Sequence, residues 1–354
     1  MSRFLSSRFA SLEAYVPGEQ PQDRQYIKLN TNESPFPPSP QVMEAVNGEQ
    51  VGLLNLYPDP ECRRLRSKLA RRYQVEEENV FLANGSDDVL NLAFMAFCDR
   101  DRGVAFPDIS YGFYPVYANL HGIPAREIPL REGFVLAAED YFGLKSNIVI
   151  ANPNAPSGRA IPVSDIEQIL RTNPDYVVVV DEAYVDFGAE SCVELIRDYD
   201  NLLVCMTFSK SRSMAGGRLG FALGSPGLIE DLNKLKFSTN PYNINRLTLV
   251  AAEATLDSED YYRNNCRTIM ANREYTVKEL DKLGFTTIPS LANFIFTSCP
   301  TMDGVTLYGK LKERGVLVRC WDKPELRDYV RVTIGSKEQM DEFLNQVRAI
   351  MEEG

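Results

Sequence analysis

Polar segments directly follow buried-looking apolar runs at four points along the chain. The pairs are NVFLA before NGSDD, IVIA before NPNAPSG, VVVV before DEAY, and LLVCMTF before SK. In open α/β sheets, ligands bind outside the carboxyl ends of the strands. These four segments are therefore the places where we expect a binding or catalytic site.

Two of the segments carry residues that suit carbonyl and ring chemistry. Lys210 follows an apolar run and a serine, where its amine could form a Schiff base if a nearby cation and desolvation favoured the neutral amine. Asp181 ends another run, where it could pair with a protonated ring nitrogen and keep that ring electron-poor. Each alone is more often a solvated strand end or a helix cap. Together, one strand–helix–strand unit apart, they indicate a site.

The segment NGSDD suits a phosphate group. Gly85, Ser86 and Asp87 lie between a strand and a helix start, where free backbone N–H groups and the helix dipole favour an anion. Arg218, in SKSRSMAGGRLGF, could add a charge-assisted contact, and Ser209 could add a hydroxyl. The simpler alternative is that Ser86 only caps the helix.

A mostly parallel sheet would bring these segments to one edge. From about residue 60 to 225, apolar runs alternate with helical patterns, and such continuous runs are typical of strands buried on both faces. The sequence therefore predicts an α/β fold, followed by a smaller α+β unit. We expect an N-terminal arm over residues 1–45, a large domain over residues 46–257 and a small C-terminal domain over residues 258–354.

Composition narrows the classes of function. A net charge of -11 over 354 residues disfavours nucleic acid and anionic membranes as partners. The single histidine, His121, leaves little for a Ser-His-Asp triad or a His-rich metal site, so we expect no metal. Seven scattered cysteines without CxxC spacing, and no apolar stretch of signal-peptide length, indicate the cytoplasm.

Eleven segments match one known family in order along the chain: AYVPG, LNTNESPFPPSP, YPDP, NGSDD, NPNAPSG, DEAY, TFSK with GGRLGF, PYNINRL, ANF, GVLVR and RVTIG. Over nearly its whole length the sequence resembles a fold-type I aminotransferase of the histidinol-phosphate aminotransferase group. The resemblance implies a mostly parallel seven-stranded sheet between helices, with a smaller α+β domain. It also implies pyridoxal 5′-phosphate as the cofactor, and a homodimer with shared active sites.

The resemblance also implies which residues contact the cofactor. Lys210 would hold it as a Schiff base and move a proton, and Asp181 would pair with the pyridine nitrogen. Tyr184 would hydrogen-bond to the phenolic oxygen of the ring. Tyr114, in preference to Tyr111, would stack on the ring. The implied phosphate contacts are Gly85, Ser86, Asp87, Ser209, Arg218 and, from the neighbouring subunit, Tyr57.

For the substrate, the resemblance implies that Arg331 binds a carboxylate in a planar pairing that a lysine could not reproduce. Arg319 and Tyr15 match positions near a distal phosphate, and Asn32 would line the same pocket. For an isolated arginine, an ordinary surface ion pair would be the simpler interpretation. Within the matched motifs the substrate role is favoured.

One departure from the family lies in the site itself. Many members have an asparagine that bonds the ring's phenolic oxygen at the position of Ala155. That contact is then missing here, or Asn154 supplies it. We expect weaker electronic tuning of the cofactor, with activity retained because Tyr184 is present.

The resemblance implies ping-pong transamination of histidinol phosphate with 2-oxoglutarate, giving imidazole-acetol phosphate and glutamate, a step of histidine biosynthesis. Threonine-phosphate decarboxylases and aromatic aminotransferases share the fold, so both remain alternatives. A cofactor-binding regulator without enzymatic activity is a further alternative. It is disfavoured because no helix-turn-helix segment precedes the domain and the main cofactor residues are all present.

Overall fold

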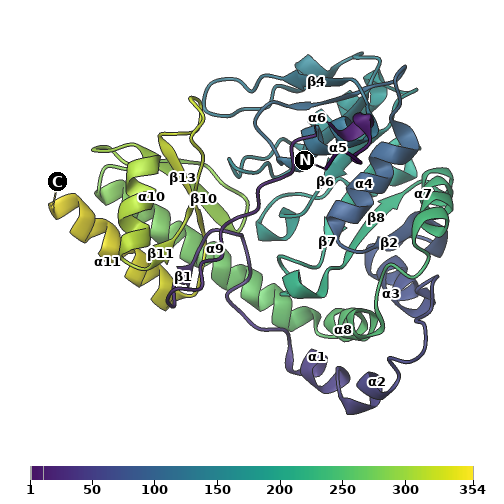
Figure 1. Cartoon of the computed structure of the whole chain (residues 1–354), viewed down its shortest axis with the longest axis horizontal. Helices are drawn as coiled ribbons and strands as arrows, with labels where there is room; N and C mark the ends of the chain where they lie inside the picture. Colours follow the sequence, from purple (N-terminus) through teal and green to yellow (C-terminus); the bar gives the residue numbers. More distant parts are fainter. Residues whose placement is uncertain (1, 11, 354) are drawn as a thin grey trace.

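A mostly parallel sheet of seven strands forms the centre of the larger part of the molecule (Figure 1). The computed structural model describes residues 2–10 and 12–353. β8 runs antiparallel to β2 and β7, and the other neighbours are parallel. This arrangement confirms the predicted α/β fold. In sheet order the strands are β2 (Val80–Ala83), β8 (Gly220–Gly224), β7 (Leu202–Thr207), β6 (Val178–Asp181), β5 (Asn147–Ala151), β3 (Val104–Pro107) and β4 (Ala125–Ile128).

Every strand except β4 is buried along its whole length, as the continuous apolar runs predicted. Because helices cover both faces of the sheet, these strands do not need to alternate apolar and polar residues. β4, with the sequence AREI, is exposed at its first three positions because it lies at the edge of the sheet. Its apolar pattern is too weak to identify it as a strand from the sequence.

Two groups of helices cover the two faces of the sheet. Buried residues of α3, α6 and α8 join one apolar cluster with the sheet, and those of α4, α5 and α7 join the other. The helices are α1 (Pro40–Ala45), α2 (Gly48–Gly52), α3 (Arg63–Tyr73), α4 (Ser86–Phe97), α5 (Phe113–His121), α6 (Val163–Thr172), α7 (Pro226–Thr239) and α8 (Arg246–Leu256).

A smaller unit lies to the left in Figure 1, connected to the large sheet through α9. Its antiparallel sheet has the order β12-β13-β10-β9, and a separate parallel pair joins β1 to β11. α8 ends at Leu256 and α9 begins at Glu259, and we propose that the domain boundary lies here. The elements are β1 (Ile27–Lys28), α9 (Glu259–Lys282), β9 (Thr286–Ile288), β10 (Phe294–Ser298), α10 (Gly304–Glu313), β11 (Val316–Leu317), β12 (Arg319–Cys320), β13 (Tyr329–Thr333) and α11 (Lys337–Glu352).

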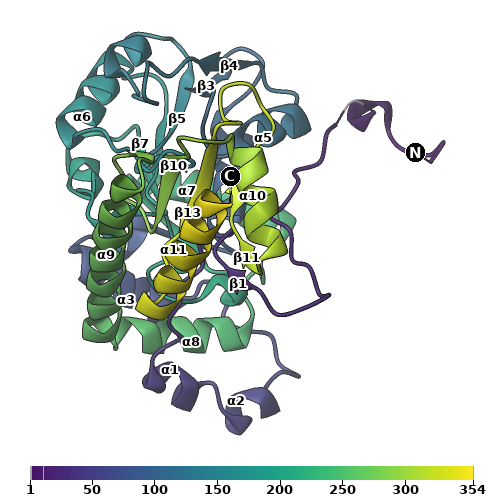
Figure 2. The ribbon, with the colours of Figure 1, turned by 90° about the vertical axis from the view of Figure 1, so that its left-hand side faces the viewer.

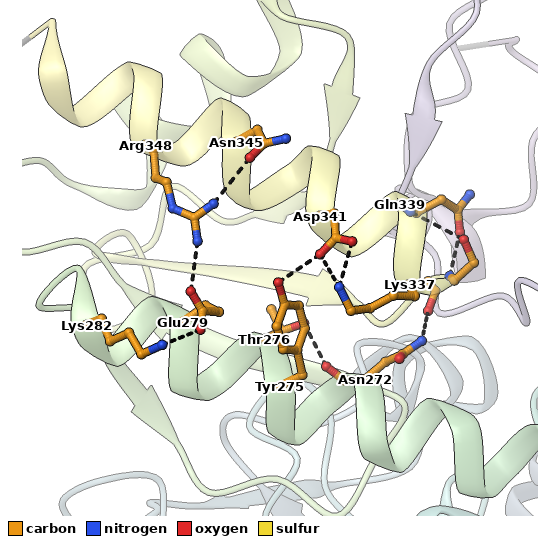
Figure 3. Close-up of polar contacts among 12 residues, drawn as sticks. Asn272, Tyr275, Thr276, Glu279, Lys282, Lys337, Gln339, Asp341, Asn345 and Arg348 are labelled. Atoms are coloured by element: carbon orange, nitrogen blue, oxygen red, sulfur yellow. Dashed lines mark hydrogen bonds and ion pairs between the residues drawn. The ribbon is translucent and has the colours of Figure 1, made fainter.

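Polar contacts fix α9 against α11 along their shared side (Figure 3). The Tyr275 hydroxyl donates to the Asp341 carboxylate at 2.8 Å, and Arg348 donates to Glu279 at 2.9 Å. Asn272 donates to the carbonyl of Gly335 at 3.0 Å, just beyond the end of β13. The buried residues of both helices also share one apolar cluster. These contacts hold the carboxyl end of β13 in place.

The N-terminal segment runs along the outside of the molecule before it reaches β1, which pairs with β11 (Figure 2). Arg8 donates to the carbonyl of Leu120 at 3.1 Å, at the end of α5. After β1, Leu29 donates to the carbonyl of Leu317 at 2.8 Å. The chain then crosses toward the large sheet. Among the described residues, none of the helices has the length and apolar character required to cross a membrane.

Candidate cofactor and substrate site

The segments after β2, β5, β6 and β7 meet at a cavity of about 390 Å³ beside the carboxyl ends of these strands. The rule for open α/β sheets therefore selected the edge at which this cavity lies. The predicted residues that line the cavity are Ser86, Asp87, Asp181, Tyr184, Ser209, Lys210 and Arg218.

Lys210 lies just past the end of β7, and its amine enters the cavity. The Nζ atom donates to the carbonyl of Thr31 at 3.3 Å and lies 5.8 Å from the centroid of the Tyr184 ring. Thr31 belongs to the segment after β1, so the small domain and the arm help to orient this lysine. The amine is therefore held at the junction of the two domains.

Asp181 ends β6 at the floor of the cavity and is buried. Burial raises its pKa to about 6, although hydrogen bonds from Tyr114 and from the backbone of Ala183 oppose this shift. The Tyr114 hydroxyl donates to Oδ2 at 3.0 Å, and the Ala183 N–H donates to Oδ1 at 3.2 Å. A cation placed against this poorly solvated carboxylate would be strongly stabilised.

The N-terminus of α4 forms an anion-binding corner. No side chain caps this helix, and its N-cap Gly85 has a φ of 89°, in the left-handed region. A Cβ at Gly85 would lie 2.8 Å from Nη2 of Arg218, and one at Gly220 would lie 2.3 Å from the backbone nitrogen of Ser86. The glycines therefore allow backbone N–H groups and a guanidinium to lie close together, as phosphate binding requires.

Asp87 contributes to this corner in a different way from the other predicted phosphate ligands. Its carboxylate pairs with Arg218 at 2.9 Å and accepts a hydrogen bond from the Tyr111 hydroxyl at 2.7 Å. A carboxylate can only accept hydrogen bonds. Asp87 can thus offer a phosphate its backbone N–H, while its side chain positions Arg218 and Tyr111.

The structure places two predicted cofactor contacts elsewhere. Tyr114 is fully buried behind the floor, where it donates to Asp181, and Tyr111 lines the cavity wall instead. The Asn154 amide donates to the carbonyl of Ile109 at 3.0 Å and accepts from Ser110 at 2.7 Å. It is therefore held within the surrounding loops, and the side chain presented to the cavity is the methyl group of Ala155.

A second, outer cavity of about 710 Å³ adjoins the first and shares Lys210, Tyr184 and Arg218 with it. The predicted substrate residues Tyr15, Asn32, Arg319 and Arg331 all line it. Burial raises the pKa of Tyr15, although the two arginines oppose this shift.

Arg319 and Arg331 each contact the Trp321 ring and donate a hydrogen bond to a backbone carbonyl. Arg331 lies 5.3 Å from the Trp321 ring centroid and donates to the carbonyl of Asn30 at 3.0 Å. Arg319 lies 5.6 Å from the same ring and donates to the carbonyl of Pro17 at 3.2 Å. Burial lowers the pKa of Arg331, and its Nε atom is buried with no hydrogen-bond partner among the described residues. An anionic ligand would satisfy such a group.

Tyr57 lies outside both cavities of its own chain. Its side chain is 78% exposed and stacks on Tyr242 with 4.4 Å between the ring centroids. Its expected phosphate contact belongs to the neighbouring subunit's site, so a single chain cannot make it.

Sequence reasoning missed four polar residues that line the inner cavity: Gln20, Thr31, Glu33 and Thr207. Thr207 is the last residue of β7, and the strand-end rule that selected Asp181 would also have found it. The other three come from the N-terminal segment, which reaches the cavity through the pairing of β1 with β11. No local pattern reveals that pairing.

The residues present fit a phosphate-bearing aromatic aldehyde. An uncapped helix N-terminus with Arg218 suits the phosphate, Asp181 suits a ring cation, and Lys210 lines the same cavity. The Tyr111 ring and the methyl group of Ala155 form apolar parts of the cavity wall. The outer arginines then suit an anionic second ligand.

Comparisons with known proteins identify the family to which the chain is similar. Residues 24–347 match the family described as aminotransferase class I and II. The chain is 52% identical to histidinol-phosphate aminotransferase of Marinomonas sp. (strain MWYL1), covering 96% of this chain and 97% of the relative. It is 47% identical to the Clostridium acetobutylicum enzyme of the same name, covering 98% and 99%. The solved histidinol-phosphate aminotransferase of Sinorhizobium meliloti, in complex with pyridoxal-5′-phosphate, superposes with a TM-score of 0.85 at 23% identity, over 99% of this chain and 100% of that one.

Proposed function

The chain belongs to the class I and II aminotransferases and is a pyridoxal-phosphate-dependent transaminase, and from this premise we propose that it transfers the amino group of histidinol phosphate to 2-oxoglutarate. The observation that supports this substrate best is the outer cavity, in which two arginines and a tyrosine lie beside the inner cavity of Lys210. A phosphorylated amine and a dicarboxylic oxo acid are both anions that such a pair of arginines can bind.

Bound pyridoxal phosphate supplies an electron-poor ring that stabilises negative charge at the substrate carbon. We propose that Asp181 keeps the ring nitrogen protonated, because a buried carboxylate is stabilised by an adjacent cation. Ser86, Ser209 and Arg218 would hold the phosphate at the α4 N-terminus, with the backbone of Gly85 and Asp87. Tyr111, in place of Tyr114, would provide the aromatic surface for the ring.

Lys210 would hold the cofactor through its amine and would then serve as the general acid and base of the proton transfer. Its amine lies at the junction of the two cavities, and so it is within reach of both the ring and a substrate in the outer cavity. The carbonyl of Thr31, 3.3 Å away, restrains the amine. Tyr184 lines both cavities, and its hydroxyl would donate a hydrogen bond to the ring's phenolic oxygen.

On the substrate side, we assign Arg331 to the carboxylate of the oxo acid and Arg319 with Tyr15 to the distal phosphate. The indole of Trp321 lies within 5.6 Å of both guanidinium groups, so it orients them before a substrate arrives. Such preorganisation reduces the entropy that binding must otherwise cost.

We also propose a homodimer with shared sites. Exposed apolar side chains gather on α1, α2 and the loop that follows, and an apolar patch of this kind marks an interaction surface. In a symmetric dimer Tyr57 would then reach the phosphate corner of the partner. Mixing Lys210→Ala with Tyr57→Ala subunits tests this, because hybrid dimers contain one intact site. Activity regained on mixing supports sharing, and no regain contradicts it.

Small anionic molecules, rather than nucleic acid or membranes, are the partners that we propose, since the chain has a net charge of -11. All seven cysteines are free thiols, four of them buried, which is consistent with our proposal of a cytoplasmic location.

The deciding experiment is an anaerobic half-reaction with the cofactor-loaded protein. We expect histidinol phosphate to replace the visible band of the bound cofactor by that of pyridoxamine phosphate without releasing carbon dioxide, and glutamate to do the same. Lys210→Ala should lack this conversion. Release of carbon dioxide from threonine phosphate would instead assign a decarboxylase. Conversion by phenylalanine, with none by histidinol phosphate, would assign an aromatic aminotransferase.

A further inference from the structure

Asn32 occupies a constrained position between the two domains. It is buried and has a φ of 56°, in the left-handed region that asparagine tolerates better than most residues. Its backbone N–H donates to Oγ1 of Thr333 at 2.9 Å, and Asn293 donates to its carbonyl at 3.0 Å. Both partners belong to the small domain, Thr333 at the end of β13 and Asn293 just before β10.

The hydrogen bonds of Asn32 fix the orientation of its carboxamide. The Thr333 hydroxyl accepts from the Asn32 backbone, so its single proton goes to Oδ1 of Asn32, 3.1 Å away. Since Oδ1 faces Thr333, Nδ2 faces the Tyr184 hydroxyl at 2.9 Å and donates to it. The Tyr184 oxygen is thereby an acceptor on this side. Its own proton is free to be donated into the inner cavity, which Tyr184 lines.

The direction of the Tyr184 proton matters because the neighbouring side chains of Ala155 and Asn154 offer the inner cavity no other hydrogen-bond donor. Ala155 presents a methyl group, and the Asn154 amide is used by Ile109 and Ser110. Neither can donate a hydrogen bond to a ring oxygen near Tyr184. The donor strength at this point of the cofactor therefore depends on which way the Tyr184 proton points.

The carboxyl end of β13 is itself held firmly. Thr333 donates its backbone N–H to the carbonyl of Leu29 at 2.9 Å, and Asn272 of α9 donates to Gly335 at 3.0 Å. Thr333 and Arg331 are two residues apart on this strand, so their side chains share one face of the sheet. The substrate arginine and the residue that orients Asn32 are thus built on one rigid element.

We infer that Thr333 is a positioning residue of the cofactor site: it orients the Asn32 carboxamide so that Tyr184 donates its proton to the cofactor instead of to Asn32. This inference rests on the proposed roles of Lys210 and Tyr184. It adds a residue of the small domain, outside both cavity walls, to the groups that tune the cofactor.

The test is a pH titration of the visible absorption band of the cofactor-loaded protein, comparing Thr333→Val with wild type. Without the Thr333 hydroxyl, the Asn32 amide can turn and accept the Tyr184 proton. A hydrogen bond donated to the phenolic oxygen stabilises its anionic form and favours loss of the proton shared with the adjacent nitrogen. Weakening this hydrogen bond should raise the apparent pKa at which the band titrates. The expected increase is about half a unit to one unit, which corresponds to one neutral hydrogen bond. Thr333→Ser, which keeps the hydroxyl, should restore the wild-type value.

Two controls separate positioning from general damage. Thr297→Val removes an equally buried hydroxyl from β10, the neighbouring strand, and should leave the titration unchanged. In a Tyr184→Phe background, Thr333→Val should add no further shift, because the donor that it orients is gone. Equal shifts in both backgrounds, or a wild-type titration in Thr333→Val, would overturn the inference. A wild-type protein without a titrating visible band would instead overturn the proposed cofactor site.

Discussion

Replacing Asp181 by asparagine should change the stability of the cofactor-free protein in a pH-dependent way. Asp181 is 5% exposed at the end of β6, and burial raises the pKa of its carboxyl to about 6. In the unfolded chain an aspartate has a pKa of about 4. Since folding raises the pKa, the stabilising effect of the bound proton is complete below about pH 4 and is lost as the pH rises through about 6.

The magnitude follows from this shift of about two units, which corresponds to about 3 kcal/mol. The asparagine side chain in the variant carries no charge at any of these pH values. The variant should therefore gain stability relative to wild type between pH 4 and pH 8, by up to about 3 kcal/mol. Urea denaturation of both cofactor-free proteins across this pH range, at one protein concentration, measures the difference.

Glu182→Gln is the matched control. Glu182 is the next residue, is 2% exposed and has a pKa raised to about 7 by burial, but its carboxylate accepts from Ser191 and Cys192 instead of lining the cavity. Both variants should gain stability at high pH without cofactor. Only Asp181→Asn should bind pyridoxal phosphate more weakly. A stability difference between wild type and Asp181→Asn that does not vary with pH would refute the assigned burial effect, and unchanged cofactor affinity would refute the ring contact.

Three further predictions concern the substrate arginines and the phosphate corner. Arg331→Lys should raise the KM for the oxo acid by about tenfold to a hundredfold, because one charged hydrogen bond contributes about 1.5–3 kcal/mol. Steady-state kinetics measure this change, and an unchanged KM would contradict the carboxylate role. Gly220→Ala should weaken cofactor binding and lower the free energy of unfolding by about 1–3 kcal/mol, because its Cβ would lie 2.3 Å from the Ser86 nitrogen. Gly227→Ala is the control: its Cβ would meet no neighbouring atom within 4 Å, so neither quantity should change. Trp321 is the only tryptophan and lies beside Arg319 and Arg331, so its fluorescence should change when inorganic phosphate is added, and this response should be lost in Arg319→Met.

The sheet edge and its polar residues could be predicted because local sequence determines them. An apolar run buried on both faces must be covered by helices, and in a parallel sheet the run ends beside its neighbours, so the sequence alone places Asp181 and Lys210 together. The edge strand β4 could not be predicted in this way, because a strand that is exposed at its first three positions has no continuous apolar run.

The choice between neighbouring residues of one type could not be made from the sequence. Tyr111 and Tyr114 lie on the same short segment, and either could have faced a ring. The structure buries Tyr114 against Asp181 and leaves Tyr111 on the cavity wall, held by Asp87. Packing of α5 on the sheet decides this, and packing depends on residues far along the chain. Asn154 is held by Ser110 and Ile109, which lie 44 and 45 residues earlier in the chain, and the local sequence does not reveal these contacts.

The division of the site between two domains explains why a small-domain substitution should be felt at the cofactor. The proposed cofactor ligands come from the rigid edge of the large sheet, whereas Arg319 and Arg331 come from β12 and β13. The segment of residues 30–32 lies between them and bonds to both sides, to Arg331 and Thr333 in the small domain and to Tyr184 and Lys210 in the large one. Any shift of β13 on substrate binding must therefore move the groups that restrain the Lys210 amine and orient the Tyr184 hydroxyl. Substrate affinity and the electronic state of the cofactor should consequently change together in variants of this segment, whereas variants of the α4 corner should change cofactor affinity without changing substrate affinity.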